Sequence, residues 1–275
     1  MSTTIIMDGR AFAERRAREH AVRAATVRAR RGCAPALHLI GFGDDGVTPP
    51  SIARKLKSGR EAGVETTADI LAPDATTADI LAAMARTPAH ADGLFLEFPF
   101  PAGVDEGALI DALDPALDVD IMTQPRVDAY MAGHGPPPAT VSAALALLDD
   151  GGVDVDGLAG VLLAERSPFT EMFAEAFARR GARMAMVAPA EAERARHAQL
   201  VIACVAQPGA LRSEELARGA VVVDAGYFNP GGRGDVDTSG GIAHLGALVP
   251  VPGGIGPATI ALLIERVIDF AEGER

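Results

Sequence analysis

Short apolar segments alternate with helix-forming segments along nearly the whole chain. The first such pair is the run ALHLIGFG at 36–43, which ends in glycine, and the segment 51–63, which closes at Gly63. Short strands that alternate with helices at this spacing are typical of βαβ units, which build parallel sheets. The sequence therefore predicts an α/β fold.

The alternation falls into two sets, which a stretch rich in proline and glycine at 133–138 separates. In the first set we expect helices at 10–31, 51–63 and 77–84 and strands at 36–43, 65–71 and 93–98. In the second set we expect helices at 140–148, 171–180 and 258–271 and strands at 160–164, 183–187, 200–205 and 220–225. We therefore predict two α/β domains with a hinge near residue 140.

The composition argues against several classes of partner. Lysine and arginine number 25 and aspartate and glutamate 37, which gives a net charge of −12 that repels nucleic acids and anionic membranes. The two cysteines, Cys33 and Cys204, have no metal-ligand spacing, so we expect neither a disulfide scaffold nor a metal site. The N-terminus has no signal-peptide pattern and no apolar run reaches about 18 residues, so we expect a cytoplasmic protein.

Ionisable residues within or next to apolar runs are the first candidates for chemistry, because burial of a charge is costly. Glu97 ends a predicted strand, Asp118 and Asp120 occur in the run LDVD, and Lys55 lies in a predicted helix. Each alone is most simply a surface charge or a helix cap. Their position near strand ends favours function, because parallel sheets bind ligands beyond the carboxyl ends of their strands.

The loop PVPGGIGP at 250–257 holds three prolines and three glycines. Such a loop is stiff and still lets its backbone approach a ligand closely. This loop and the ionisable residues belong to a series of motifs that occur in a fixed order. The motifs are MDGR at 7–10, GDD at 43–45, GLFLEFPFP at 93–101, DVD at 118–120, PAT at 138–140, DAG at 224–226, GDV at 234–236 and PVPGGIGPAT at 250–259. With these motifs the chain resembles, from end to end, the bacterial bifunctional methylenetetrahydrofolate dehydrogenase/cyclohydrolase (FolD) family.

The resemblance implies two domains with the substrate in a cleft between them. The N-terminal α/β folate-site domain would span 1–139 and be completed by the C-terminal helix at 258–275, and a Rossmann-like parallel-sheet domain for NADP would span 140–257. The implied catalytic residues are Lys55, Glu97 and Asp120. The residues implied to bind the folate substrate, tetrahydrofolate in its 5,10-methylene form, are Ser51, Asp120, Pro252, Gly253, Gly254 and Thr259.

Three positions on the folate side depart from the family. Ser51 stands where the family has tyrosine, Glu97 where it has glutamine, and Ile121-Met122 where it has Gly-Phe. A serine cannot stack on an aromatic ring, so one wall of the site would be open to water or to a second substrate. A carboxylate at 97 would stabilise the ammonium form of Lys55, so that Lys55 donates a proton and Glu97 acts as the base.

The nicotinamide side departs further. Glu165 and Glu171 replace two glycines of the phosphate loop, Ala188-Pro189 replaces His-Ser, and Ala206 replaces another glycine. At an effective dielectric of about 20, one contact between like charges near 4 Å costs on the order of 4 kcal/mol. The sequence therefore predicts that NADP binds poorly or not at all, with Arg166 and Ser167 as remnants of its site.

Three functions follow as hypotheses. The first is a folate-dependent one-carbon enzyme that transfers the methylene group to a small-molecule acceptor, or releases it, without NADP. The second is the pair of activities usual in the family, NADP-dependent dehydrogenase and methenyltetrahydrofolate cyclohydrolase. The third is a non-catalytic folate-binding subunit, against which the presence of Lys55 and Asp120 argues. The resemblance also implies a homodimer.

Overall fold

The computed structural model describes residues 3–44, 47–226 and 232–273, so Asp45 of the GDD motif lies outside the described residues. The chain divides into two compact units. The first combines Met1–Ala13 with Pro136–Thr259, and the second combines Glu14–Gly135 with Ile260–Arg275. The domain limits at 139 and 257 stay a prediction. The compact units have other limits, because the first 13 residues belong to the same unit as Pro136–Thr259.

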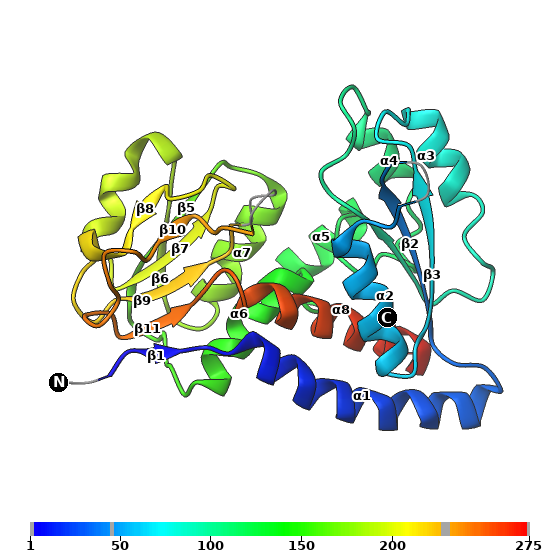
Figure 1. Cartoon of the computed structure of the whole chain (residues 1–275), viewed down its shortest axis with the longest axis horizontal. Coiled ribbons are helices and arrows are strands. Elements are labelled where there is room, and N and C mark those ends of the chain that lie inside the picture. The colour runs from blue at the N-terminus through cyan, green and yellow to red at the C-terminus, as the bar shows by residue number, and fades with distance from the viewer. Residues whose placement is uncertain (1–2, 45–46, 227–231, 274–275) are drawn as a thin grey trace. The chain divides into compact units, whose positions relative to one another are not determined.

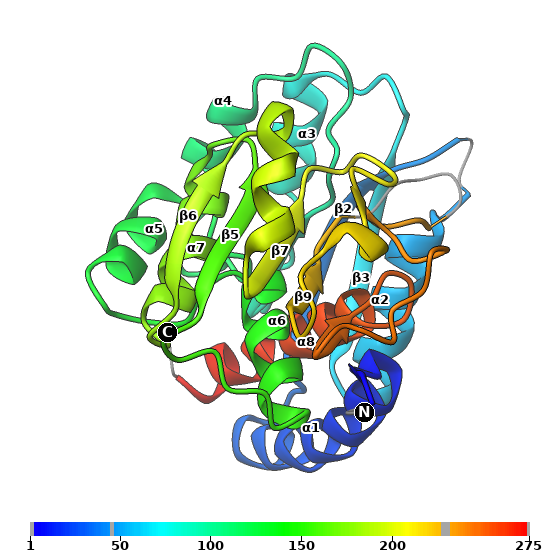
Figure 2. The same ribbon diagram turned by 90° about the vertical axis from the view of Figure 1, so that its left-hand side faces the viewer.

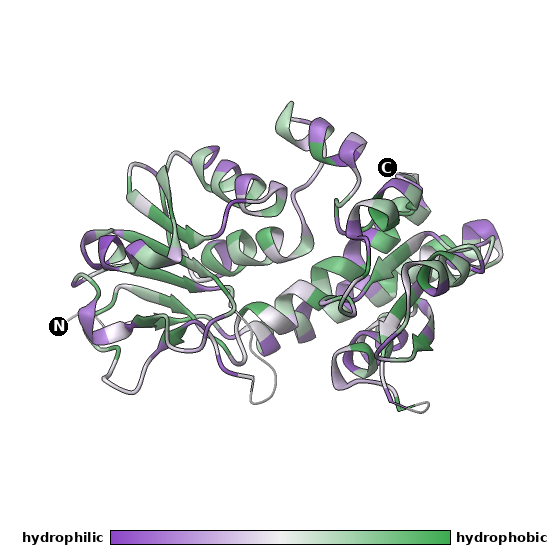
Figure 3. Ribbon diagram, turned by 90° about the horizontal axis from the view of Figure 1, so that it is seen from above, coloured by the Kyte–Doolittle hydropathy of each residue, from purple (hydrophilic) through white to green (hydrophobic). Residues whose placement is uncertain are grey.

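The first unit is built on a six-stranded parallel sheet (Figure 1). Its strands, in spatial order, are β1 (Ile5–Ile6), β11 (Ala247–Val249), β9 (Val221–Asp224), β7 (Leu200–Cys204), β5 (Ala159–Ala164) and β6 (Arg183–Val187). The central strands are buried along almost their whole length, and in Figure 3 they carry the colour of hydrophobic residues. Continuous apolar strands of this kind are what a parallel sheet covered on both faces requires.

Figure 2 shows the neighbouring strands β5, β6 and β7 of this sheet side by side. Helices and short elements complete the first unit. The longer elements are α6 (Ala139–Asp150), α7 (Pro168–Ala178) and the 3-10 helix η1 (Pro189–His197), and the shorter ones are β8 (Leu211–Arg212), η2 (Ser213–Glu215) and β10 (Val236–Asp237). The helix predicted at 171–180 begins earlier, at Pro168. Ser167 caps this helix by accepting a hydrogen bond from the Thr170 backbone, and proline is well tolerated at the first helical position.

The second unit is built on a three-stranded parallel sheet with the order β3 (Glu65–Leu71), β2 (Ala36–Phe42) and β4 (Gly93–Leu96). The central strand β2 is buried except at its last residue. The strand predicted at 93–98 ends at Leu96, and Glu97 follows it with its N–H still donating to the Ile40 carbonyl at 2.9 Å. This places the Glu97 side chain at the carboxyl edge of the sheet.

The helices of the second unit are α2 (Pro50–Glu61), α3 (Thr77–Met84), α4 (Glu106–Ala112), α5 (Gln124–Met131) and the larger parts of α1 (Gly9–Arg31) and α8 (Ile255–Glu272). Ion pairs hold α1 to α8, with Arg16 2.6 Å from Glu265 and Arg23 2.6 Å from Asp269. α4 and α5 were not predicted from the sequence, because they have only 7 and 8 residues and show little periodicity. Among the residues that the structure describes, no helix combines the length and apolar character that a membrane crossing requires.

Candidate functional site

Two residues predicted to be catalytic meet at the carboxyl edge of the sheet in the second unit. Lys55 Nζ, from α2, donates to Glu97 Oε2 at 2.7 Å, and the two side chains are only 12% and 15% exposed. Lys55 Nζ also lies 4.7 Å from the ring centroid of Phe95, within the range of a cation–π contact. Side chains two apart on a strand share a face, so Phe95 and Glu97 approach Lys55 together.

Close packing of α2 on the sheet sets the position of Lys55. Ile52, in the first turn of α2, is fully buried. A Cβ added at Gly41 on β2 would come within 2.9 Å of the Ile52 side chain, so glycine at 41 lets the helix approach. Ser51 lies four residues before Lys55, hence on the same helix face, and is half-buried.

The segment 118–123 is held by its buried aspartate. The carboxylate of Asp118 accepts hydrogen bonds from the Met122 and Thr123 backbone and, at 2.8 Å, from the Thr123 hydroxyl. Asp120 lies in the sequence between Asp118 and Met122, the residues that these hydrogen bonds join, and it is half-buried. Ile121 has a φ of 57°, a left-handed conformation that costs a non-glycine residue roughly 1–2 kcal/mol. The hydrogen bonds to Asp118 and the burial of Ile121 offset this strain.

A buried arginine from α8 supports the same segment. Arg266 is 4% exposed, and its Nη1 donates to the Val119 carbonyl at 2.9 Å. Burial lowers the pKa of Arg266, and the charges of Asp120, Asp269 and Asp118 oppose that shift. Arg266 is not among the residues predicted from the sequence, because a single arginine on an apolar helix gives no local signal of its partners.

The predicted folate-binding residues of the first unit lie in and after the loop between β11 and α8. Gly253 has a φ of 94° and accepts a hydrogen bond from the Gly9 backbone at 2.9 Å. A Cβ on Gly254 would lie 2.4 Å from the Pro250 carbonyl oxygen, so both glycines are required by the backbone path. The Thr259 hydroxyl donates to the Ile255 carbonyl within α8. Their roles in folate binding, with that of Pro252, stay predictions.

The residues predicted as remnants of a cofactor site lie where β5 leads into α7. Arg166 Nη1 donates to Glu171 Oε1 at 2.8 Å, and their side chains are 72% and 44% exposed. Ser167 is the N-cap residue of α7. A helix N-terminus with an adjacent arginine is a favourable place for an anion.

Two buried aspartates organise the carboxyl ends of β7 and β9. Asp235 accepts hydrogen bonds from three successive backbone N–H groups, those of Val205, Ala206 and Gln207, and Ala206 has a φ of 52°. Asp224 accepts from the backbone of Gly226, Asp235 and Val236. Burial raises the pKa of Asp224 to about 7 despite these three hydrogen bonds.

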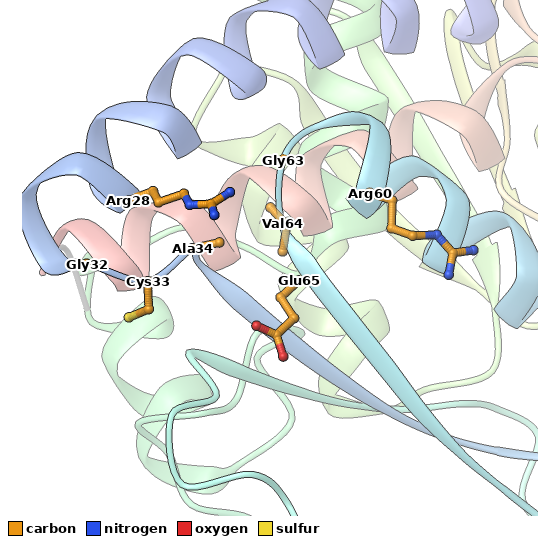
Figure 4. Close-up of a pocket in the computed structure, with 8 residues that line it drawn as sticks. All are labelled: Arg28, Gly32, Cys33, Ala34, Arg60, Gly63, Val64 and Glu65. Atoms are coloured by element: carbon orange, nitrogen blue, oxygen red, sulfur yellow. The ribbon is translucent and has the colours of Figure 1, made fainter.

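A separate concavity of about 370 Å³ lies at the amino ends of β2 and β3, the sheet edge opposite to Lys55 (Figure 4). Its lining residues are Arg28, Gly32, Cys33, Ala34, Arg60, Gly63, Val64 and Glu65. Arg28 and Arg60 belong to the last turns of α1 and α2, where cations stabilise helix ends. None of the predicted site residues lines it.

Two family models match the chain. The model for the catalytic domain of tetrahydrofolate dehydrogenase/cyclohydrolase matches residues 7–120. The model for the NAD(P)-binding domain of the same proteins matches residues 138–275. Together they cover almost the entire sequence.

Relatives of known sequence and structure agree with these models. Bifunctional protein FolD 1 of Streptomyces avermitilis is 31% identical over 278 residues, which cover 99% of this chain and 96% of the relative. Bifunctional protein FolD of Acidiphilium cryptum is 32% identical over 283 residues, covering 98% and 99%. The methylenetetrahydrofolate dehydrogenase-cyclohydrolase of Trypanosoma brucei, solved with NADP cofactor and an inhibitor, has a TM-score of 0.90 at 24% identity and covers 99% of each chain. This last likeness shows the two-domain α/β fold.

The match of residues 138–275 to an NAD(P)-binding domain overturns the expectation that NADP binds poorly or not at all. That expectation treated Glu165 and Glu171 as bare charges facing a phosphate. In the structure Glu165 is exposed, and Glu171, whose side chain is 44% exposed, pairs with Arg166. A paired carboxylate in contact with water repels a nearby anion far less than the about 4 kcal/mol assigned to a bare contact.

Proposed function

The chain belongs to the tetrahydrofolate dehydrogenase/cyclohydrolase family, and from that premise we propose that it oxidises 5,10-methylenetetrahydrofolate with NADP and hydrolyses the 5,10-methenyl product. The observation that carries this proposal is the ion pair of Lys55 with Glu97 at the carboxyl edge of the sheet. The first hypothesis, methylene transfer without NADP, has no support from the relatives. The second hypothesis replaces it.

For the hydrolysis, the pair offers a base and an acid side by side. Glu97 accepts a proton from the water that adds to the methenyl carbon, which gives a neutral carbinolamine. Lys55 donates a proton to N5 as the bond from carbon to N5 breaks, and it regains a proton from the hydroxyl group that becomes the formyl carbonyl. The balance is one water consumed and one proton released, with 10-formyltetrahydrofolate as the product.

For substrate binding, the carboxylate of Asp120 would accept hydrogen bonds from the amino and ring N–H groups of a pterin. Asp118 and Arg266 act on Asp120 by fixing the segment that carries it. Ser51, one turn before Lys55, and the segment Pro252–Gly254 with Thr259 complete the proposed folate-binding set.

The residues at the start of α7 fit an anionic cofactor. The dipole of α7 favours an anion near its N-terminal turn, Arg166 adds a cation there, and the charge of Glu171 is offset by that arginine. Arg166 and Ser167 would hold a phosphate of NADP, which when bound supplies the acceptor for the hydride that leaves the methylene carbon.

The test is a pair of assays on the purified protein. Reduced nicotinamide is followed with 5,10-methylenetetrahydrofolate and either NADP or NAD, and the loss of added 5,10-methenyltetrahydrofolate is followed by its absorbance. Lys55→Met should lose methenyl hydrolysis, whereas Lys57→Met should not, because the Lys57 side chain is 74% exposed and pairs with the exposed Glu61. Wild-type protein that neither reduces nicotinamide nor hydrolyses the methenyl form would overturn the proposal.

A further inference from the structure

An exposed phenylalanine directly follows Glu97 of the Lys55–Glu97 pair in the sequence. Phe98 is 46% exposed, although large aromatic side chains are normally covered. Of the large hydrophobic side chains that are exposed in the described part of the chain, Phe98 is the one aromatic. Phe98 directly follows Glu97, so its backbone lies at the carboxyl edge of the sheet, the edge at which parallel sheets bind ligands.

The ring of Phe98 contacts the ring of Phe100, which in turn contacts the ring of Phe42. The centroids of Phe98 and Phe100 are 4.4 Å apart at an interplanar angle of 50°, and those of Phe100 and Phe42 are 6.1 Å apart at 78°. Phe42 ends β2 and is partly buried, as is Phe100. The cluster therefore ties an exposed ring to the central strand of the sheet, and this backing holds Phe98 in place without a ligand.

We propose that Phe98, backed by Phe100 and Phe42, is the surface on which an aromatic ring of the folate substrate stacks. This rests on the proposed function. Ser51, which shares a helix face with Lys55, offers no ring to a substrate. Folates carry two aromatic systems, the pterin and the benzoyl ring, and both present faces suited to an offset or edge-on contact with phenylalanine.

The first experiment measures tetrahydrofolate binding by calorimetry, and KM and kcat for 5,10-methylenetetrahydrofolate. Phe98→Ala should weaken binding and raise KM about tenfold with little change in kcat, because it removes a contact present in both ground and transition states. Phe98→Leu should weaken binding nearly as much, whereas Phe98→Tyr should bind as the wild type does. The matched control is Met131→Ala, which truncates another exposed apolar side chain of the same unit, 43% exposed in α5.

The second experiment uses the absence of tryptophan from this chain. Phe98→Trp creates a single tryptophan at the proposed surface, and Met131→Trp creates one at the control position. Tetrahydrofolate should quench the emission of the first variant saturably, at the concentration at which calorimetry detects binding. The second variant provides the correction for absorption of light by the folate.

The outcomes separate this inference from the proposed function. If wild-type protein binds and turns over the folate and both Phe98→Ala and Phe98→Leu do so equally well, the stacking surface is wrong and the proposed function stands. Equal quenching in the two tryptophan variants would also contradict the stacking surface. If wild-type protein binds no tetrahydrofolate, both proposals fail together.

Discussion

Lys55 and Glu97 form an ion pair in which Nζ lies 2.7 Å from Oε2 and neither side chain is more than 15% exposed. Removing one partner from such a site leaves the other charge poorly solvated. The resulting loss of folding free energy exceeds the net contribution of the ion pair itself. Conservative variants that keep a hydrogen bond are therefore the informative ones. The pair places an ammonium group and a carboxylate within one hydrogen bond of each other.

Glu97→Gln should lower methenyl hydrolysis about 10²-fold, the usual contribution of a general base, and affect nicotinamide reduction less. The amide can still accept a hydrogen bond from Lys55, so the fold should persist. Both rates are measured on one preparation, with Glu61→Gln, which alters the exposed partner of Lys57, as the control. Faster hydrolysis in Glu97→Gln would show that the carboxylate suppresses the reaction instead of promoting it.

Arg166→Ala should weaken NADP binding about tenfold, because it removes a charge-assisted contact and leaves Glu171 without its partner. Calorimetric titration with NADP measures this loss. Arg179→Ala is the control, since Arg179 caps the opposite end of α7 and pairs with Glu175. Equal affinities of wild type and Arg166→Ala would place the cofactor phosphates elsewhere.

Asp224 should make the free energy of unfolding fall as the pH rises from about 4 to about 7. Burial raises its pKa from 3.8 to about 7 in the folded state, so in this window the folded chain binds more protons than the unfolded chain. Urea unfolding across the window measures the slope for wild type and for Asp224→Asn, which cannot titrate. The variant should be less stable throughout and lose part of the slope; identical slopes would contradict the assignment to Asp224.

Ala206→Gly should raise the free energy of unfolding by about 0.5 kcal/mol, because glycine adopts the left-handed backbone at φ 52° without the steric cost that alanine has. Ala185→Gly is the control, since Ala185 is also exposed but lies in β6. There, glycine should destabilise by about 0.5–1 kcal/mol. Thermal and urea unfolding compare the two variants, and the same sign of change in both would show that backbone strain at 206 is not being relieved.

Much of the fold could be predicted from local sequence. The predicted helix at 77–84 and the strands at 65–71 and 183–187 coincide with α3, β3 and β6. These elements have their own signals, such as the Thr76 and Asp79 side chains that form a capping box at the start of α3. Family membership was likewise predicted, because its motifs are contiguous runs whose residue types meet local backbone needs, as in the loop at 250–257.

The tertiary structure decided what surrounds the charges. Local sequence contains Lys55, Glu97 and Asp118, but the contact of Lys55 with Phe95 and the electrostatic interaction of Asp118 with Arg266 are set by which elements pack together. The same reason explains the error over NADP, since the field of Glu171 depends on Arg166 and on contact with water. Composition and motifs determine which charges a chain carries. The energy of each charge depends on distance and dielectric, and only the folded arrangement sets those.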